Sequence, residues 1–117
     1  MVTAQALFDA GRHYMVCFVC QQIAEKALKA YLFSKGEPPA LTHGVDDLCR
    51  IAASHDAAFA QLRERVSILD GYYVPTRYPD SLPSGIPAHV YNSTAAQQAL
   101  QLAQQALDFV GARLESR

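Results

Sequence analysis

Apolar side chains recur along most of this chain at intervals of three and four residues, which is the spacing of one face of an α-helix. No segment shows the period-2 alternation that is typical of a half-buried strand. The pattern therefore predicts an all-α protein. The expected helices cover about residues 3–10, 13–34, 42–55 and 56–72, and a last helix begins near Ser93 or Thr94, either of which could cap it.

The helix expected at residues 13–34 has the strongest pattern, and Gly36 followed by two prolines marks its end. Its polar positions fall within an arc of about 140°, and one such window on an otherwise apolar helix is typical of a central helix with several neighbours. We expect Glu25 to pair with Lys29 on a solvated face that also includes Lys26. The polar positions are Gln21, Gln22, Glu25, Lys26 and Lys29.

The later helices each have one apolar stripe, so each is expected to bury one side. The expected inward residues are Leu48, Ile51 and Ala52 in the third helix, Phe59, Leu62, Val66, Leu69 and Tyr73 in the fourth, and Ala96, Ala99, Leu100, Ala103, Leu107, Val110 and Leu114 in the last. This arrangement predicts an antiparallel up-and-down bundle of four or five helices. A chain of 117 residues fits one domain, residues 1–117.

Composition narrows the classes of partner. The formal net charge is only −1, so the chain lacks the overall positive charge that drives non-specific nucleic-acid binding. The longest uninterrupted apolar run, Tyr14 to Cys20, is far below the roughly 20 residues that span a bilayer. The N-terminus also lacks the pattern of a signal peptide. We therefore expect a cytoplasmic protein with no membrane partner.

Three cysteines cannot all pair within one chain, and Cys17 and Cys20 form a C-x-x-C motif. A structural zinc site needs about four ligands, and the chain has no second pair of this kind. The motif also lies inside a helical apolar run, whereas a redox motif would open a helix after a strand. We expect buried, unreactive thiols at Cys17, Cys20 and Cys49, and no metal site.

The helical pattern stops at "GYYVPTRYPD", residues 71–80, and stays interrupted until Pro87. The prolines in this stretch exclude a regular helix. Connections of this length without secondary structure are usually functional or disordered. Tyr72, Tyr73 and Tyr78 argue against disorder, because disordered segments are poor in aromatic residues. We therefore expect a functional loop.

Three segments, in this order, carry a family resemblance: "FVCQQIAEKALKAYLFSKG", His43 followed by "DDL", and "YYVPTRYPD". Together with the last helix they resemble the prokaryotic HEPN family (higher eukaryotes and prokaryotes nucleotide-binding) over roughly residues 8–114. The resemblance implies a helical bundle that forms a homodimer. It also implies a small nucleotidyltransferase as partner, in a toxin–antitoxin pair. Many members are metal-independent ribonucleases, so no cofactor is implied.

The ribonuclease signature of that family is Arg, four to six residues, then His, often continued as His-x-Tyr, near the start of the last helix. This chain has "HVY" there, at residues 89–91, but Ser84 stands where the arginine is expected, and the nearest upstream arginine is Arg77. A literal match, Arg50 to His55, lies at the end of the third helix. We interpret it as a chance match.

RNA cleavage without a metal needs a base, an acid and a cation that stabilises the phosphorane. His89 could serve as base or acid near neutral pH. Arg77 could form two hydrogen bonds with one phosphate. Tyr78 and Tyr91 could donate hydrogen bonds or stack on a base, and Asp80 could hold Arg77 or orient His89.

Each of these residues also has a structural interpretation. Asp80 could accept hydrogen bonds from backbone amides in a turn while Arg77 caps the fourth helix. The tyrosines could be core or interface rings, and His89 could be an ordinary surface histidine. His43 could make a hydrogen bond at the start of the third helix rather than a ligand contact. Lys26 could contact a phosphate rather than belong to a solvated face.

The sequence therefore predicts a dimeric HEPN protein that binds RNA or nucleotide phosphate at this loop. A metal-independent endoribonuclease toxin and a pure dimerisation or interaction module are the alternatives. The chain has no glycine-rich phosphate loop, so any such binding must come from side chains. The candidate catalytic residues are Arg77 and His89, and the candidate ligand contacts are Tyr78, Asp80, Tyr91, Lys26 and His43.

Overall fold

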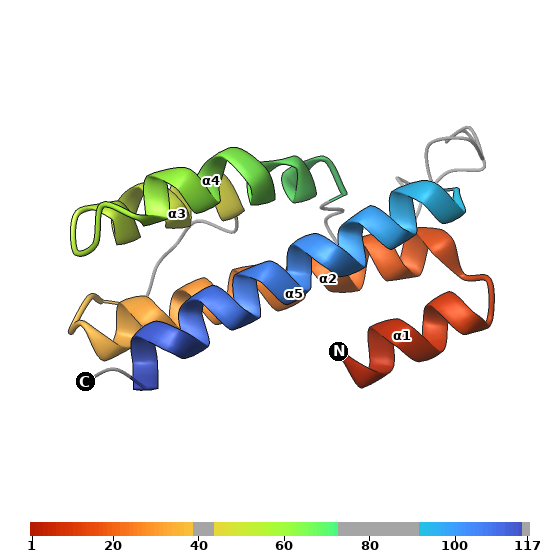
Figure 1. Ribbon diagram of the computed structural model, residues 1–117, viewed down its shortest axis with the longest axis horizontal. Helices are drawn as coiled ribbons and strands as arrows, with labels where there is room; N and C mark the ends of the chain where they lie inside the picture. The colour runs from red at the N-terminus through yellow and green to blue at the C-terminus, as the bar shows by residue number, and fades with distance from the viewer. Residues whose placement is uncertain (39–43, 73–91, 116–117) are drawn as a thin grey trace.

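The computed structural model describes residues 1–38, 44–72 and 92–115, and these residues contain helices and no strand. This confirms the predicted all-α bundle. The helix at His13–Ser34 has the predicted bounds, and the others differ from their predicted bounds by a few residues. The elements are α1 (Val2–Asp9), α2 (His13–Ser34), α3 (Val45–Ala53), α4 (Phe59–Val66), the 3-10 helix η1 (Ser67–Tyr72) and α5 (Ser93–Glu115) (Figure 1).

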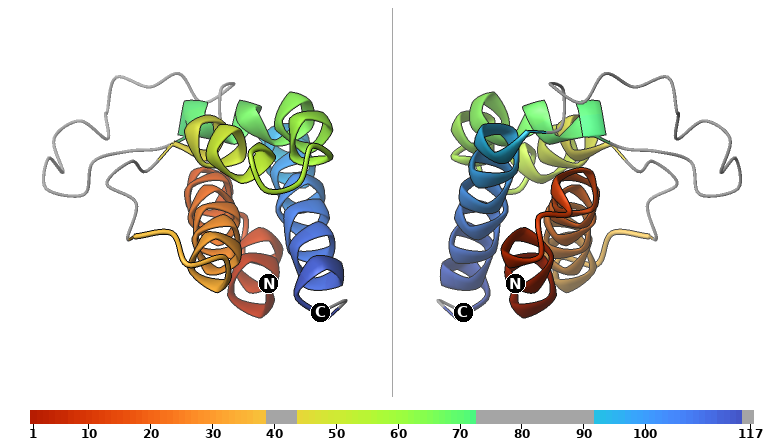
Figure 2. Two further views of the ribbon diagram at one scale, coloured as in Figure 1. Left: turned by 90° about the vertical axis from the view of Figure 1, so that its left-hand side faces the viewer. Right: turned by 90° about the vertical axis from the view of Figure 1, so that its right-hand side faces the viewer.

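The two long helices, α2 and α5, lie side by side and run in the same direction (Figure 1). The ring of Phe59 joins their C-terminal parts, with its centroid 4.5 Å from that of Tyr31 in α2 and 4.8 Å from that of Phe109 in α5. The consecutive pairs α1–α2, α3–α4 and α4–α5 are antiparallel. Figure 2 shows the α3–α4 pair covering one side of the two long helices, while α1 lies on the other.

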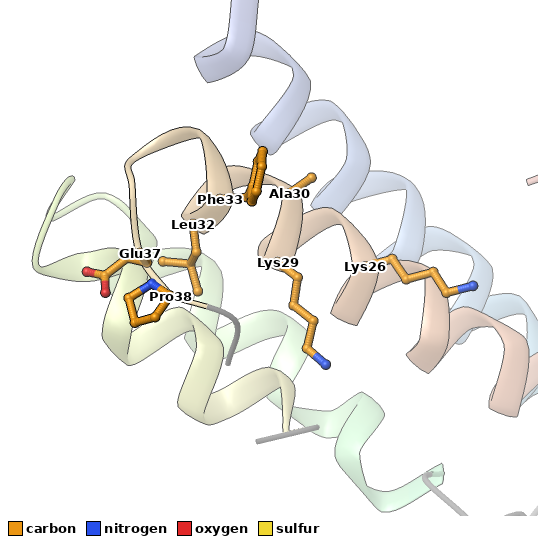
Figure 3. A pocket seen from close by; sticks show the side chains of 7 residues that line it. All are labelled: Lys26, Lys29, Ala30, Leu32, Phe33, Glu37 and Pro38. Atoms are coloured by element: carbon orange, nitrogen blue, oxygen red, sulfur yellow. The ribbon is translucent and has the colours of Figure 1, made fainter. Parts of the chain in front are cut away.

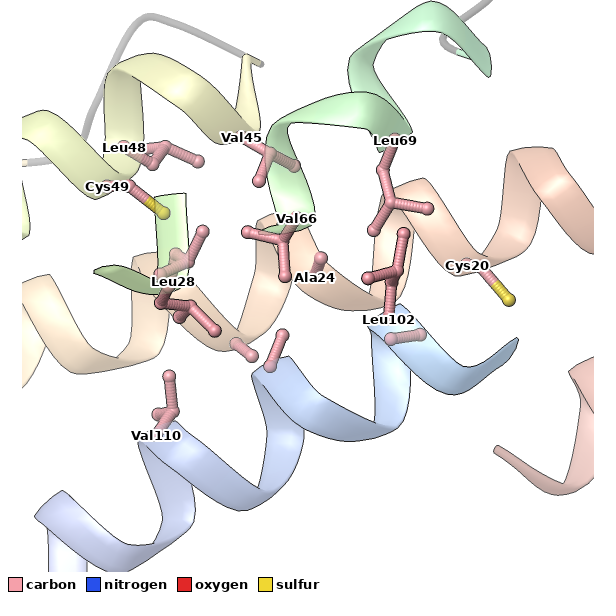
Figure 4. Close-up of a cluster of buried hydrophobic side chains, with 14 of the residues drawn as sticks. Cys20, Ala24, Leu28, Val45, Leu48, Cys49, Val66, Leu69, Leu102 and Val110 are labelled. Atoms are coloured by element: carbon pink, nitrogen blue, oxygen red, sulfur yellow. The ribbon is translucent and has the colours of Figure 1, made fainter. Parts of the chain in front are cut away.

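Buried side chains from all five α-helices and η1 form one continuous core, and Figure 4 shows its centre. Most of the predicted inward residues belong to it, and Leu100, Leu107 and Leu114 are partly buried and pack against it. The predicted inward residue Tyr73 lies outside the described residues. Ile51 is not part of the core: it is 37% exposed, and Cys49 is buried instead, together with Val45 and Ala52. Leu102 and Ala106 were not predicted to be inward and are buried, because α5 packs against α1, α2 and α4 and so buries a wider face than one stripe.

The predicted fourth helix is not one continuous α-helix. An α-helical part ends at Val66, and the chain continues as the 3-10 helix η1. At the junction, the Ser67 hydroxyl lies within hydrogen-bond distance of the Arg63 carbonyl oxygen and is 3.0 Å from Asp46 Oδ1. Serine hydroxyls that bond to the preceding turn compete with regular helical hydrogen bonds, which accounts for the change at this residue.

Two helices begin at caps that the sequence pattern did not predict. At the start of α5, Asn92 Oδ1 accepts a hydrogen bond from the backbone N–H of Ala95 at 2.8 Å, so Asn92, and not Ser93 or Thr94, is the capping residue. At the start of α3, the carboxylate of Asp70 accepts hydrogen bonds from the backbone N–H groups of Val45 and Asp46, at 2.6 and 3.0 Å. Asp70 lies in η1, so this cap joins segments that are distant in the sequence.

Asp46 ties α3 to α4. Its carboxylate accepts a hydrogen bond from Arg63 Nε at 2.5 Å, and it also lies 3.3 Å from the guanidinium of Arg50. The hydrogen bond from Arg63 lowers the pKa of Asp46 below its ordinary value. The contribution of this group to stability is therefore present above the ordinary aspartate pKa and is lost as the pH falls through the lowered pKa.

Two glycines in helical surroundings are expected to respond oppositely to alanine. Gly36 follows the end of α2 at a φ of +80°, where an L side chain is strained, so Gly36→Ala should lower the free energy of unfolding by about 1–2 kcal/mol. Gly111 lies inside α5, and an added Cβ would meet no atom within 4 Å, so Gly111→Ala should raise it by about 0.5–1 kcal/mol. Urea unfolding curves measure both. Equal shifts of the same sign would contradict this assignment.

Candidate functional site

Of the seven candidate site residues, the structure describes one, Lys26. Lys26 lies in α2 and is exposed. The other candidates, His43, Arg77, Tyr78, Asp80, His89 and Tyr91, lie outside the described residues, so their convergence on one anion stays a prediction. The described chain stops at Tyr72, at the end of η1, and resumes at Asn92, at the start of α5. Both η1 and α5 pack against α2, which makes α2 the described element on which a site can be built.

A row of polar side chains runs along α2 and is partly buried. Gln21 is 0% exposed and Glu25 is 6% exposed. Glu25 Oε1 accepts a hydrogen bond from Gln21 Nε2 at 3.4 Å, and Glu25 Oε2 accepts one from Lys29 Nζ at 2.9 Å. Gln22 extends the row by donating to Gln21 Oε1 at 2.7 Å. We call Gln21, Gln22, Glu25 and Lys29 the α2 polar row.

The α2 polar row corrects one prediction and confirms another. The pairing of Glu25 with Lys29 is confirmed. The solvated face is wrong for Glu25, which is only 6% exposed on a helix against which η1 and α3 also pack. The signal was present in the sequence, since Gln21 and Glu25 share their face with Leu28 and Leu32 at the spacing of one helical stripe. Polar residues in line with buried leucines point to a buried polar cluster.

The burial of Glu25 determines what the α2 polar row can do. A carboxylate is costly to bury unless it is paired and hydrogen-bonded. Glu25 meets this condition through Gln21 and Lys29, and Lys29 reaches it with a side chain that is still 29% exposed. The row therefore holds the Lys29 ammonium group in a fixed place at the edge of α2. Lys26, one turn earlier, makes no ion pair within the described part of the chain.

A pocket of about 420 Å³ opens at the C-terminal half of α2 and the turn that follows it (Figure 3). Figure 3 shows the Lys26 and Lys29 side chains extending from α2 in different directions. The remaining wall is mostly apolar, apart from Glu37. The lining residues are Lys26, Lys29, Ala30, Leu32, Phe33, Glu37 and Pro38. We call this the α2 pocket.

The literal Arg-x4-His match does not form a site in this structure. Arg50 pairs with Asp46 at 3.3 Å on the surface of α3. His55 Nε2 lies 2.7 Å from Glu37 Oε1, in the turn after α2. The two side chains are thus engaged by different carboxylates, in keeping with a chance match.

The three cysteines are buried and unpaired, as expected. Burial raises the pKa of the Cys17 thiol to about 11 and the pKa values of the Cys20 and Cys49 thiols to about 12. These thiols therefore stay protonated at neutral pH. Within residues 1–38, 44–72 and 92–115, no group of three or more His, Cys, Asp or Glu side chains is placed to hold a metal ion. In the same ranges, no helix has the length and apolar content needed to cross a membrane.

The sequence of this chain matches the model of a known protein family. The family model described as "HEPN domain" matches residues 1–114, which is nearly the whole chain. The chain belongs to the HEPN family. The match includes α2 with its polar row as well as residues 73–91, so the segments that suggested the resemblance lie inside it.

Two solved structures share this HEPN fold. The crystal structure of TT1696 from Thermus thermophilus is 38% identical, with a TM-score of 0.75, and the match covers 94% of this chain and 86% of that one. ST0689, described as an archaeal HEPN homologue, is 29% identical, with a TM-score of 0.70, and the match covers 95% of this chain and 85% of that one. No curated protein matches the chain.

Proposed function

We propose that this HEPN protein binds RNA or a nucleotide by its phosphate, through the segment 73–91, and that it acts with a small nucleotidyltransferase in a toxin–antitoxin pair. The observation that carries the proposal is the buried α2 polar row. A buried ion pair adds little net stability, because the cost of removing both charges from water offsets their attraction. Its presence on the central helix favours a role in fixing polar groups at a binding surface, where Lys26, one turn from the paired Lys29, carries the charge that no described carboxylate balances.

Other charged residues of the chain support an anionic ligand. Lys26 adds a second ammonium group on the same helix, and no carboxylate among the described residues pairs with it. Arg77 would supply a guanidinium that can form two hydrogen bonds with a phosphate, and Tyr78 and Tyr91 would supply rings for stacking. The formal net charge of −1 agrees with a local site rather than a broad basic surface.

Endoribonuclease activity is the second candidate, and the "HVY" sequence at residues 89–91 favours it. In this candidate His89 accepts the proton of the ribose 2′-hydroxyl as that oxygen attacks the phosphorus. The imidazolium then gives the proton to the departing 5′-oxygen as the bond from phosphorus to that oxygen breaks, and Arg77 stabilises the charge on the phosphorane. A homodimer is part of both candidates, and its support is the family resemblance. Mass measurement in solution at micromolar concentration tests it, and a monomer would remove it.

Binding and cleavage can be separated in one assay. The purified protein is mixed with single-stranded RNA and excess EDTA, and both fluorescence anisotropy and RNA length are followed. We expect Arg77→Ala to weaken binding on the order of tenfold, because one charge-assisted phosphate contact is lost. Arg12→Ala is the matched control, since Arg12 is exposed and its side chain makes no capping hydrogen bond at the start of α2.

Each outcome has a definite meaning. Binding without cleavage, weakened by Arg77→Ala and not by Arg12→Ala, supports the binding function. Cleavage in EDTA that disappears in both Arg77→Ala and His89→Ala supports the ribonuclease. An RNA affinity that neither arginine substitution changes removes the role of Arg77. No binding and no cleavage leaves a dimerisation or interaction module.

A further inference from the structure

The α2 pocket differs from an ordinary surface hollow in one respect: an aromatic ring stands exposed at its rim. Phe33 is 80% exposed, although it lies in the last turn of α2, whose other face is buried. Isolated exposed apolar residues are common and need no function. Phe33 is not isolated, because the exposed Ala30 lies beside it on the same side of α2, while Leu32 and Pro38 line the pocket from the other side of the helix end (Figure 3).

A cation lies on the same face of α2 as this ring. Lys26 and Phe33 are seven residues apart, which places them nearly in line and about 10 Å apart along the helix axis. Ala30 lies between them, and its small side chain leaves the space open. The Lys26 ammonium group is not neutralised by any described carboxylate, whereas Lys29 pairs with Glu25 and Glu37 contacts His55. The charge that the pocket can offer to a ligand is therefore that of Lys26.

We infer that the α2 pocket is a subsite for one nucleotide unit of single-stranded RNA, in which a base stacks on the ring of Phe33 and the adjoining phosphate contacts Lys26. Aromatic side chains beside basic groups are how proteins bind single-stranded nucleic acid without reading its sequence. A nucleotide carries a flat ring and an anion in one unit, and the pocket offers a counterpart to each. Its volume is also within the range of about 300–1,000 Å³ that holds small ligands.

This inference rests on the proposed RNA function and extends it to a second part of the surface. Phe33 and Lys26 lie on the outer face of α2, and the segment 73–91 leaves and rejoins the described chain at η1 and α5. An RNA that occupies both parts must be longer than one nucleotide. The subsite would therefore contribute affinity and length preference, with no part in a chemical step.

The test measures affinity for single-stranded RNA of about 16 nucleotides by fluorescence anisotropy, at several salt concentrations. We expect Phe33→Ala to weaken binding on the order of tenfold, the effect of losing one stacked base. Phe33→Tyr should keep the affinity of the original protein, because the ring is retained. Lys26→Gln should reduce the slope of log Kd against log salt by about 0.7, the value for one phosphate contact on a single strand.

The controls separate this inference from the proposed function. Val2→Ala removes another exposed apolar side chain, in α1, and should leave affinity unchanged. If Arg77→Ala weakens binding and Phe33→Ala does not, the subsite is wrong and the proposed function stands. If Phe33→Ala weakens binding and Arg77→Ala does not, the subsite stands and the assignment of residues 73–91 is wrong. If no RNA binds, both are wrong.

A second copy of this chain is the competing occupant of the pocket. In that case Phe33→Ala would change the mass of the protein in solution from that of a dimer to that of a monomer. RNA affinity in the Phe33 variants would then follow the fraction of dimer and not the presence of the ring. That result would overturn the subsite. Because Phe33 is exposed, Phe33→Ala should leave the fold intact, so lost binding would not result from misfolding. Circular dichroism of each variant checks that the helices are intact.

Discussion

Phe59→Ala is expected to lower the free energy of unfolding by about 3–5 kcal/mol, which is the usual cost of removing a buried aromatic ring. Phe59 is 0% exposed and is the largest fully buried side chain among the residues that the structure describes. Its ring packs on Tyr31 and on Phe109, and the guanidinium of Arg113 lies over it at 5.8 Å. The substitution would thus open a cavity where α2, α4 and α5 meet. Urea or thermal unfolding measures the change.

Phe33→Ala is the matched control, because it makes the same chemical change on an exposed surface. Phe33 is 80% exposed, so its loss should change stability by no more than about 0.5 kcal/mol. The difference between the two variants isolates the effect of burial from the effect of the substitution itself. Similar losses in both would mean that Phe59 is not the packing centre of the α2, α4 and α5 contact.

Lys29→Ala is expected to lower the free energy of unfolding by about 2 kcal/mol, because it removes a partner from a carboxylate that is nine-tenths buried. Glu25 would keep its hydrogen bond with Gln21, so the loss should fall short of that for a wholly unpaired buried charge. Chemical unfolding at neutral pH, where Glu25 is ionised in the unfolded chain, measures the effect.

Lys26→Ala provides the comparison, since it is the same substitution three residues away in the same helix. Helix propensity is therefore matched, and we expect a change within about 0.5 kcal/mol. Adding Glu25→Gln to Lys29→Ala should restore part of the lost stability, because the amide carries no charge to bury. If Lys29→Ala and Lys26→Ala lower the free energy of unfolding by the same small amount, the ion pair between Lys29 and Glu25 makes no net contribution to stability.

The sequence was most informative where local pattern determines structure. The bounds of α2 follow from its long apolar pattern and from Gly36, whose positive φ ends the helix. The cap of α3 could not be predicted in this way, because its acceptor, Asp70, is 25 residues from Val45 and meets it only after folding. Asn92 was missed for a different reason: it, Ser93 and Thr94 are all good capping residues, and local propensity does not rank neighbours so finely.

The candidate site was predicted less completely than the fold. The residue types and their spacing predicted the pairing of Glu25 with Lys29 and made Lys26 a candidate phosphate contact. They did not predict that Gln21 and Glu25 are buried. A helical wheel does place Gln21 and Glu25 in line with Leu28 and Leu32, but their polar types favour a solvated face, and whether that face is covered depends on how α3 and η1 pack on α2. Phe33 was missed because an apolar residue at a helical spacing is ordinarily assigned to the core. Whether Arg77 and His89 converge is a tertiary question that neither residue type nor spacing answers, and both residues lie outside the described part of the chain.

Because α2 and α5 run in the same direction, their helix dipoles are aligned. Each helix carries partial charges of about +0.5 at its start and −0.5 at its end, and these two, of 22 and 23 residues, add rather than cancel. The helices that run against them, α1 and α4, have only 8 residues each and offset a small part. A chain with a formal net charge of only −1 should therefore possess a substantial dipole moment along its 44 Å axis. The helix backbones therefore make the end at which α2 and α5 begin, where the described chain resumes at Asn92, the more positive end, whereas at the α2 pocket, toward the other end, an anion depends on the side-chain charge of Lys26.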